Sequence, residues 1–193
     1  MALWGITDAD EAKPKWLTTA QKKEVFANNS GWGVEAGSTQ TGNDNTDAQP
    51  EVLCCVGDLA TGIGAADITE IEFITTAFDK SDGGNIDVRV RFNEQVTVNT
   101  SGGTPTLTIT NDTPARNLTA TYLSGSTTNE LIFRKTIAAA NAATNAGDVL
   151  SIGANPLALA SGTIKDTADG TTNATITSVA SIGAAAETIT VAA

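Results

Sequence analysis

The segment NIDVRVRFNEQVTV, residues 85–98, decides the fold class of this chain. Ile86, Val88 and Val90 are each separated by one charged residue, and Phe92 continues the same series. A period of two is the pattern of a β-strand that buries one face and exposes the other. The segment therefore predicts a sheet protein and argues against a catalytic α/β fold.

Similar alternation recurs along the rest of the chain, between clusters of turn-forming residues. We expect further strands at residues 68–75, 106–110, 118–123, 129–135, 149–152, 173–177 and 187–191. The alanine-rich stretch 138–146 fits either a helical turn or an irregular connection. Together these elements predict an all-β fold, with a single Ig-like antiparallel β-sandwich over residues 67–193.

A short helix is predicted near the amino end, over about residues 19–28. Thr18 lies three residues before Gln21, which is the spacing of a capping box, and an Asn-Asn-Ser-Gly run ends the helix. Such a short helix is unstable alone, so its Val25 and Phe26 must pack on another surface.

The chain is predicted to divide into three parts. Residues 1–35 hold all three tryptophans and are expected to form an extended N-terminal anchoring arm. Residues 36–66, rich in Gly, Asn, Thr and Asp, are expected to be a linker with one short strand at 52–56. The sandwich follows.

Large apolar side chains are concentrated in the arm, where too little chain surrounds them to cover them. Aromatic side chains bury large areas and dominate the energetics of interfaces. We therefore predict that the arm binds a partner, and the alternative is that these side chains fold back onto the chain's own sandwich. The predicted partner-binding set is Leu3, Trp4, Trp16, Leu17, Val25, Phe26 and Trp32.

The composition argues against several classes of function. Eleven basic against 22 acidic residues give a net charge of −11, which repels phosphate backbones and anionic lipid, so we expect no nucleic-acid or membrane partner. The chain has no histidine, the commonest general base and metal ligand, so we expect no enzymatic activity and no cofactor. The amino end lacks the pattern of a secretion signal, which predicts synthesis in the cytosol.

Cys54 and Cys55 are adjacent and can bridge only through a strained ring. No further thiol or imidazole is present to complete a metal site. We expect two reduced thiols on opposite faces of a strand, one buried and one half exposed.

Two pairs of aspartates lie in glycine-bearing loops, Asp79 with Asp82 and Asp166 with Asp169. Calcium binding and paired-carboxylate glycosidase chemistry are the specific hypotheses for such pairs. Neither loop has the ligand series of an EF-hand, and no aromatic sugar platform accompanies the acids. Ordinary turns are the interpretation that we favour, with no metal site.

An ordered series of motifs resembles the cadherin-like bacterial Ig repeat of surface adhesins. It consists of Phe-Asn-Glu-x-Val at 92–96, Thr-Pro-Thr-Leu-Thr at 104–108, Ala-Thr-Tyr-x-Ser-Gly-Ser at 120–126, Leu-x-Phe at 131–133 and Thr-Ile-Lys-Asp at 163–166. The resemblance covers roughly residues 68–178. It implies an Ig-like sandwich, here in a single copy.

The amino-terminal sequences ALWGITDADEAKPKWL and KEVFANNSGW are similar to a segment of virion structural proteins from contractile-tailed phages of marine cyanobacteria and their relatives. That resemblance implies an amino end that binds the particle and an exposed Ig-like body. The function that it implies is capsid decoration, or cementing, on the outer surface of the virion head. The major capsid protein would be the partner, and a trimer of the chain itself stays open.

Two alternatives remain at this point. The first is a tail, neck or fibre component of a virion with the same plan. The second is a bacterial surface-adhesion module, for which a secretion signal or tandem copies would be the supporting feature.

Overall fold

The computed structural model describes residues 13–193. The amino-terminal elements are α1 (Thr19–Glu24), β1 (Phe26–Asn28), β2 (Gly31–Val34), β3 (Glu51–Cys55) and α2 (Leu59–Gly62). The next elements are β4 (Ile68–Phe73), β5 (Phe78–Asp79), β6 (Gly84–Asn99), β7 (Thr106–Asn111), β8 (Leu118–Ser124) and β9 (Thr128–Ile137). The last are β10 (Val149–Ser151), β11 (Leu157–Ala158), β12 (Thr163–Asp166), α3 (Ala180–Ala184) and β13 (Ile189–Ala192).

The described chain is mostly β, as the alternation predicted, with 41% of its residues in strands and 8% in helices. The strands form one connected mixed sheet in the order β3-β2-β1-β6-β9-β8-β7-β10-β13-β5, and β4, β11 and β12 pair off this path. Most pairs are antiparallel, but β1 runs parallel to β6 and β13 runs parallel to β5. The sheet is open, since the order begins at β3 and ends at β5.

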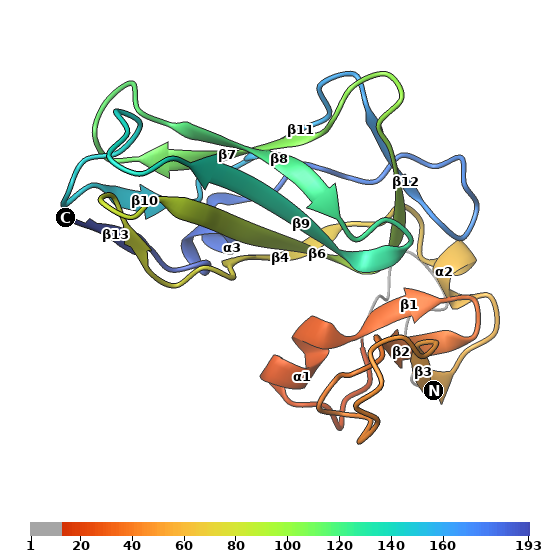
Figure 1. Cartoon of the computed structure of the whole chain (residues 1–193). Helices are drawn as coiled ribbons and strands as arrows, with labels where there is room; N and C mark the ends of the chain where they lie inside the picture. The colour runs from red at the N-terminus through yellow and green to blue at the C-terminus, as the bar shows by residue number, and fades with distance from the viewer. Residues whose placement is uncertain (1–12) are drawn as a thin grey trace.

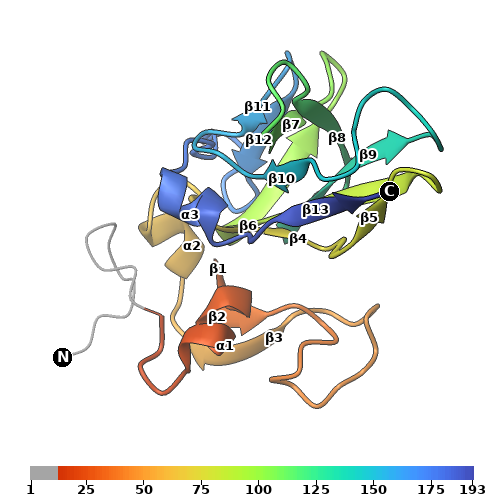
Figure 2. The same cartoon turned by 90° about the vertical axis from the view of Figure 1, so that its left-hand side faces the viewer.

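We call residues 66–193 the β-body and residues 13–63 the N-terminal module. Figure 1 shows the module, with α1 and β1–β3, beside one end of the β-body, and Figure 2 shows the same separation from another side. The helix α2 lies where the two parts meet.

The core of the β-body follows the predicted alternation. Ile86, Val88, Val90 and Phe92 of β6 are fully buried, while Arg89 is only partly covered. The predicted inward positions of β7, β8 and β9 are also buried, except that Tyr122 is partly exposed. The edge of its ring meets Phe133, with the ring centroids 6.0 Å apart.

A bulge interrupts β6 directly after this alternating stretch. Arg91 pairs with Glu130 of β9, and the next pair is Val96 with Thr128. Between these pairs β6 has four residues, 92–95, and β9 has only Asn129. Such an insertion bends a strand and re-aims its side chains. Beyond the bulge β6 pairs with β12, so one strand serves two groups of neighbours.

The N-terminal module has a small core of its own. Val25, Trp32 and Val34 pack with residues of α2, and all are buried. The β1–β2 hairpin is closed by the Asn28 side-chain oxygen, which accepts from the backbone N–H groups of Ser30 and Gly31 at 2.8 and 3.1 Å. Gly31 has a φ of +135°, and a Cβ there would overlap the Cys54 carbonyl, so only glycine fits.

Helix α1 begins as the capping box predicted. The Thr18 hydroxyl accepts from the Gln21 backbone N–H at 3.2 Å, and the Gln21 side chain accepts from the Thr18 N–H at 2.9 Å. The helix ends at Glu24 rather than near residue 28, because Val25 is already extended. Within residues 13–193, no helix has the length and apolar character needed to cross a bilayer.

The predicted division at the amino end differs from the structure in two ways. The described part of residues 1–35 is a folded helix and hairpin, whereas an extended arm was expected. The segment 36–66 carries the expected strand, but this strand pairs with β2 and so belongs to the module. The segment at 138–146 contains turns and no helix, and 173–177 forms only isolated bridges.

Replacement of Phe133 by Ala should lower the free energy of unfolding by about 3–5 kcal/mol, because it leaves a cavity in the core of the β-body. The matched control is Leu123→Ala on the neighbouring strand, where the side chain is exposed and the change should stay within about 0.5 kcal/mol. Urea unfolding measures both. Equal losses in the two variants would contradict the core described here.

Candidate functional site

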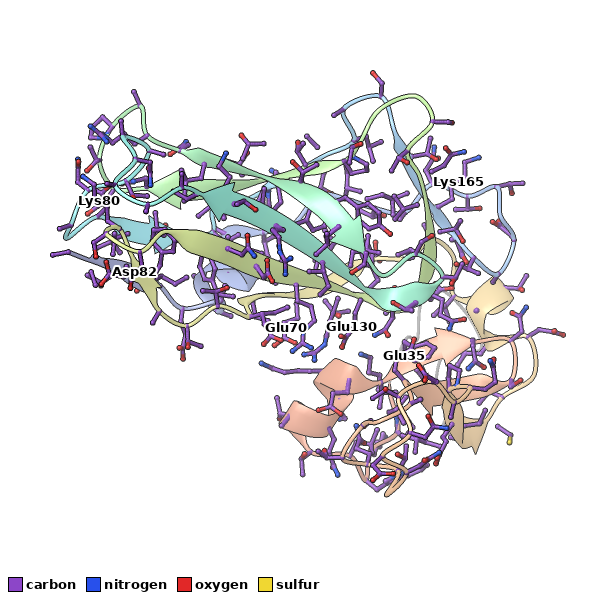
Figure 3. The ribbon with its side chains drawn as sticks, in the orientation of Figure 1. Glu35, Glu70, Lys80, Asp82, Glu130 and Lys165 are labelled. Atoms are coloured by element: carbon purple, nitrogen blue, oxygen red, sulfur yellow. The ribbon has the colours of Figure 1, made fainter. Side chains whose placement is uncertain are left out.

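The junction between the N-terminal module and the β-body holds an unusual concentration of buried charge. Figure 3 shows Glu70 and Glu130 on the face of the β-body that is turned toward the module, with Glu35 of the module opposite. Arg91 of β6 lies among them and bonds to Glu70. The alternation in β6 predicts that Arg91 points away from the core of the β-body. The N-terminal module covers that face of the sheet, so Arg91 is buried.

The charged groups form a connected network, which we call the charged junction. Arg91 donates through Nε to the Glu130 carboxylate at 2.6 Å and bonds to Glu70. Lys23 of α1 reaches across to Glu70 at 2.5 Å, which joins the module to the β-body. Arg89 extends the network through its bonds to Glu72 and Glu130.

The ionisation of this network follows from its partners. Burial acts to raise the pKa of Glu70, but hydrogen bonds from Lys23 and Arg91 outweigh it and leave that pKa below its ordinary value. Burial acts to lower the pKa of Arg91, and its bonds to the surrounding carboxylates reverse that effect. Both groups therefore stay charged at neutral pH.

Glu35 lies in a cleft of 340 Å³ beside the charged junction, lined also by Glu24, Arg89, Arg91 and Glu130. Burial raises the pKa of the Glu35 carboxyl, the backbone N–H of Asn129 and the side chain of Gln95 oppose the rise, and the negative charge of Glu130 adds to it. One Glu35 oxygen has no hydrogen-bond partner.

On the other flank of the bulge a cavity of 380 Å³ opens between the module and the β-body. Glu94 and Asp166 line it, and both are almost completely buried. Burial raises the pKa of the Asp166 carboxyl, the backbone N–H of Ala168 opposes the rise, and the negative charge of Asp169 adds to it. Glu94 is also the residue of β6 that pairs with Ala27 of β1.

The predicted partner-binding residues occupy three different environments. Leu3 and Trp4 lie outside the described residues. Leu17, Val25, Phe26 and Trp32 are buried within the chain itself, three of them in the core of the module. This differs from the expectation that all seven are anchors, because a side chain that its own chain covers offers no surface to a partner. Trp16 is 58% exposed.

The cysteines and the aspartate loops also have definite places. Cys54 is half-buried and Cys55 is exposed, both as free thiols, so the pair is more exposed than expected. Asp79 accepts hydrogen bonds from the backbone N–H and the hydroxyl of Ser81. Asp169 accepts from the backbone N–H groups of Thr171 and Thr172. These are the bonds of turns, and across residues 13–193 no group of three or more acidic or sulfur side chains is arranged to hold a metal ion.

The arrangement does not favour acid–base catalysis. Glu70 and Glu130 are held by arginines. The junction is suited to joining two parts of the chain.

Sequence reasoning missed every residue of the charged junction as a functional group. The available signal was charge complementarity, since Glu70 and Glu72 on one predicted strand could face Arg89 and Arg91 on another. That signal predicts pairing between strands. It does not reveal that a third element covers the pairs.

Comparison with known proteins adds no relative: no protein-family model, no curated protein and no solved structure matches this chain. The argument about function therefore depends on the residues and their geometry.

Replacement of Arg91 by Ala should cost about 3–5 kcal/mol of unfolding free energy, because it removes the cation that the buried Glu70 shares with the half-buried Glu130. Arg134→Ala is the control, since it removes an arginine from the same sheet whose pair with Asp87 is only partly buried and involves a single carboxylate, and the loss should be smaller, about 1 kcal/mol or less. Chemical denaturation at pH 7 compares the two. A small loss for Arg91→Ala would show that the network contributes little.

Proposed function

We propose that this protein is a non-enzymatic virion protein that decorates a phage capsid. In this proposal its amino end binds the lattice of the major capsid protein, and the β-body projects outward from the head. The resemblance of residues 1–35 to virion structural proteins is the starting point. Trp16, exposed at the edge of the module, is the observation that carries the proposal furthest.

In the sequence, Trp16 follows residues 1–12, which include Leu3 and Trp4. A tryptophan that remains open to solvent on a folded module is an available anchor, because burial of an aromatic side chain supplies much of the energy of an interface. The binding surface is therefore narrower than the sequence suggested, and consists of Leu3, Trp4 and Trp16.

The charged junction suits this function mechanically. Lys23 of the module and Arg91 of the β-body both bond to Glu70, and β1 pairs with β6. A body tied to its attachment module at several points is held in a defined orientation. Repetition over a lattice then converts modest single affinities into a large gain in shell stability.

The β-body in this proposal is an Ig-like sandwich. Support comes from the motif series at 92–166 and from the antiparallel neighbours β6, β9, β8 and β7. The long β6 also pairs with both β4 and β12, as expected of a strand that crosses between two layers.

Co-sedimentation with capsids stripped of accessory proteins tests the function. The full chain should bind in a fixed ratio to the major capsid protein, and a chain of residues 13–193 should stay in solution. Trp16→Ala should weaken binding about tenfold or more, the loss typical of an aromatic anchor. Val179→Ala, which truncates an exposed apolar side chain on the β-body, is the matched control and should bind normally.

Failure of the full chain to bind would remove the capsid proposal. Binding to isolated tails, necks or fibres in the same assay would move the protein to another position in the virion. Binding to bacterial cells but to no virion part would favour the adhesion alternative.

A further inference from the structure

Glu35 has no role in the proposed attachment, although it lines the cleft between the N-terminal module and the β-body. It directly follows β2, and Figure 3 shows it opposite Glu130 of β9. Its Oε1 atom is buried and accepts no hydrogen bond from any residue that the structure describes. An ionised carboxylate is costly in that position, because its oxygen loses bonds to water and gains none in return. A protonated Glu35 avoids this cost.

The charges around Glu35 also favour its neutral form. The cations of the charged junction are already bonded to other carboxylates, in the pairs Arg89–Glu72, Arg89–Glu130, Arg91–Glu70, Arg91–Glu130 and Lys23–Glu70. Besides the two arginines, the charged side chains that line the cleft with Glu35 are Glu24 of α1 and Glu130. An ionised Glu35 would therefore share the cleft with two further anions. Protonation removes that repulsion and makes the carboxyl a hydrogen-bond donor.

The backbone on both sides of Glu35 belongs firmly to the module. Val34, which precedes it, is fully buried in the core of the module. On the other side, the Ser38 N–H donates to the Glu35 carbonyl at 3.2 Å, and the Ser38 hydroxyl donates to Glu24 of α1 at 2.7 Å. A repulsive force on the Glu35 side chain therefore acts on the module as a whole.

The bonds that join this part of the module to the β-body are few. The backbone pairing of β1 with β6 consists of one residue pair, Ala27 with Glu94. Lys23 reaches Glu70 at 2.5 Å, but its own side chain is half exposed, which limits the strength of the ion pair. The position of the module is therefore sensitive to a single buried charge.

We propose that Glu35 is a pH-sensitive switch of the contact between the N-terminal module and the β-body. While Glu35 is neutral, the module stays closed on β9. When Glu35 loses its proton, the new charge beside Glu24 and Glu130 favours a state in which the module moves away from β9 and water reaches the carboxylate. The switch needs no capsid partner, so it goes beyond the proposed function.

The direction of the response follows from the Glu35 carboxyl. Burial raises its pKa, the backbone N–H of Asn129 and the side chain of Gln95 oppose the rise, and the charge of Glu130 adds to it. A carboxyl whose pKa is raised in the folded chain stabilises the closed state fully below its ordinary pKa, and that contribution is lost as the pH rises through the raised value. Closure is therefore strongest in acid and weakens toward neutral pH.

Two other carboxyl groups titrate near the same interface. Burial acts to raise the pKa of Glu70, but the bonds from Lys23 and Arg91 leave it lowered, so its contribution is lost only as the pH falls through the lowered value. Burial raises the pKa of Asp166, which lines the cavity on the other flank of the bulge and acts in the same direction as Glu35. Separate substitutions distinguish Glu35 from Asp166.

Hydrogen exchange of the full chain compares the wild type with Glu35→Gln at pH 4 and pH 7.5, since the amide keeps the shape of the side chain and carries no charge. At pH 7.5, protection of residues 33–41 and 127–131 should be about tenfold higher in Glu35→Gln, which removes a buried charged acceptor without a partner. At pH 4 the two proteins should be equally protected. Protection of β7 and β8 should be the same in both proteins at each pH, because the β-body stays folded.

Two further variants complete the comparison. Asp47→Asn removes an exposed carboxyl from the segment between β2 and β3, and it should match the wild type at both pH values. Asp166→Asn should keep the response that depends on Glu35. If Glu35→Gln folds poorly, titration of the Glu35 carboxyl by ¹³C NMR in the wild type replaces it. The pKa should then lie above that of an ordinary glutamate, and a value at or below the ordinary one would end the proposal.

Three exchange results would overturn the switch. The first is equal protection of the wild type and Glu35→Gln at pH 7.5. The second is a difference of the same size at both pH values, which would make the effect one of packing and not of titration. The third is loss of the pH response in Asp166→Asn, which would assign it to the other cavity. None of these results involves capsid binding, so they leave the attachment proposal untouched.

Discussion

Four residues of β6 face a single residue of β9, and this bulge is the constraint on which both parts of the molecule depend. Before the bulge, β6 pairs with β4 and β9 and buries the core of the β-body. After it, the same strand pairs with β12. At the bulge itself, the backbone of Glu94 pairs with Ala27 of β1. One local insertion thus redirects β6 within the β-body and provides the backbone on which the N-terminal module docks.

The charged junction explains why the N-terminal module and the β-body form one unit. Arg91 and Glu70 would lie on the solvent face of an isolated β-body, where an ion pair contributes little. The module covers them and lowers the local dielectric, so the loss of either partner becomes costly.

Most strands of the β-body could be predicted, because the order of apolar and polar residues within a strand indicates which of its faces is buried. Alternation in β6, β7 and β9 records one buried face, and the Thr18–Gln21 capping box records the start of α1. The N-terminal module was not predictable in the same way. Phe26 and Trp32 sit in short stretches that carry no periodicity, and β1–β3 become a sheet only by pairing residues as far apart as Gly31 and Cys55.

The sequence by itself determined that the chain is mostly β, acidic and without histidine, because propensity, alternation and composition are local or summed quantities. It also placed a cluster of large apolar groups at the amino end. Only the tertiary structure decided which of these groups are core and that Trp16 is exposed. Likewise, only folding brought Glu94 and Asp166 to the same cavity and Lys23 to Glu70, since burial and pKa depend on contacts between residues that the linear order keeps far apart.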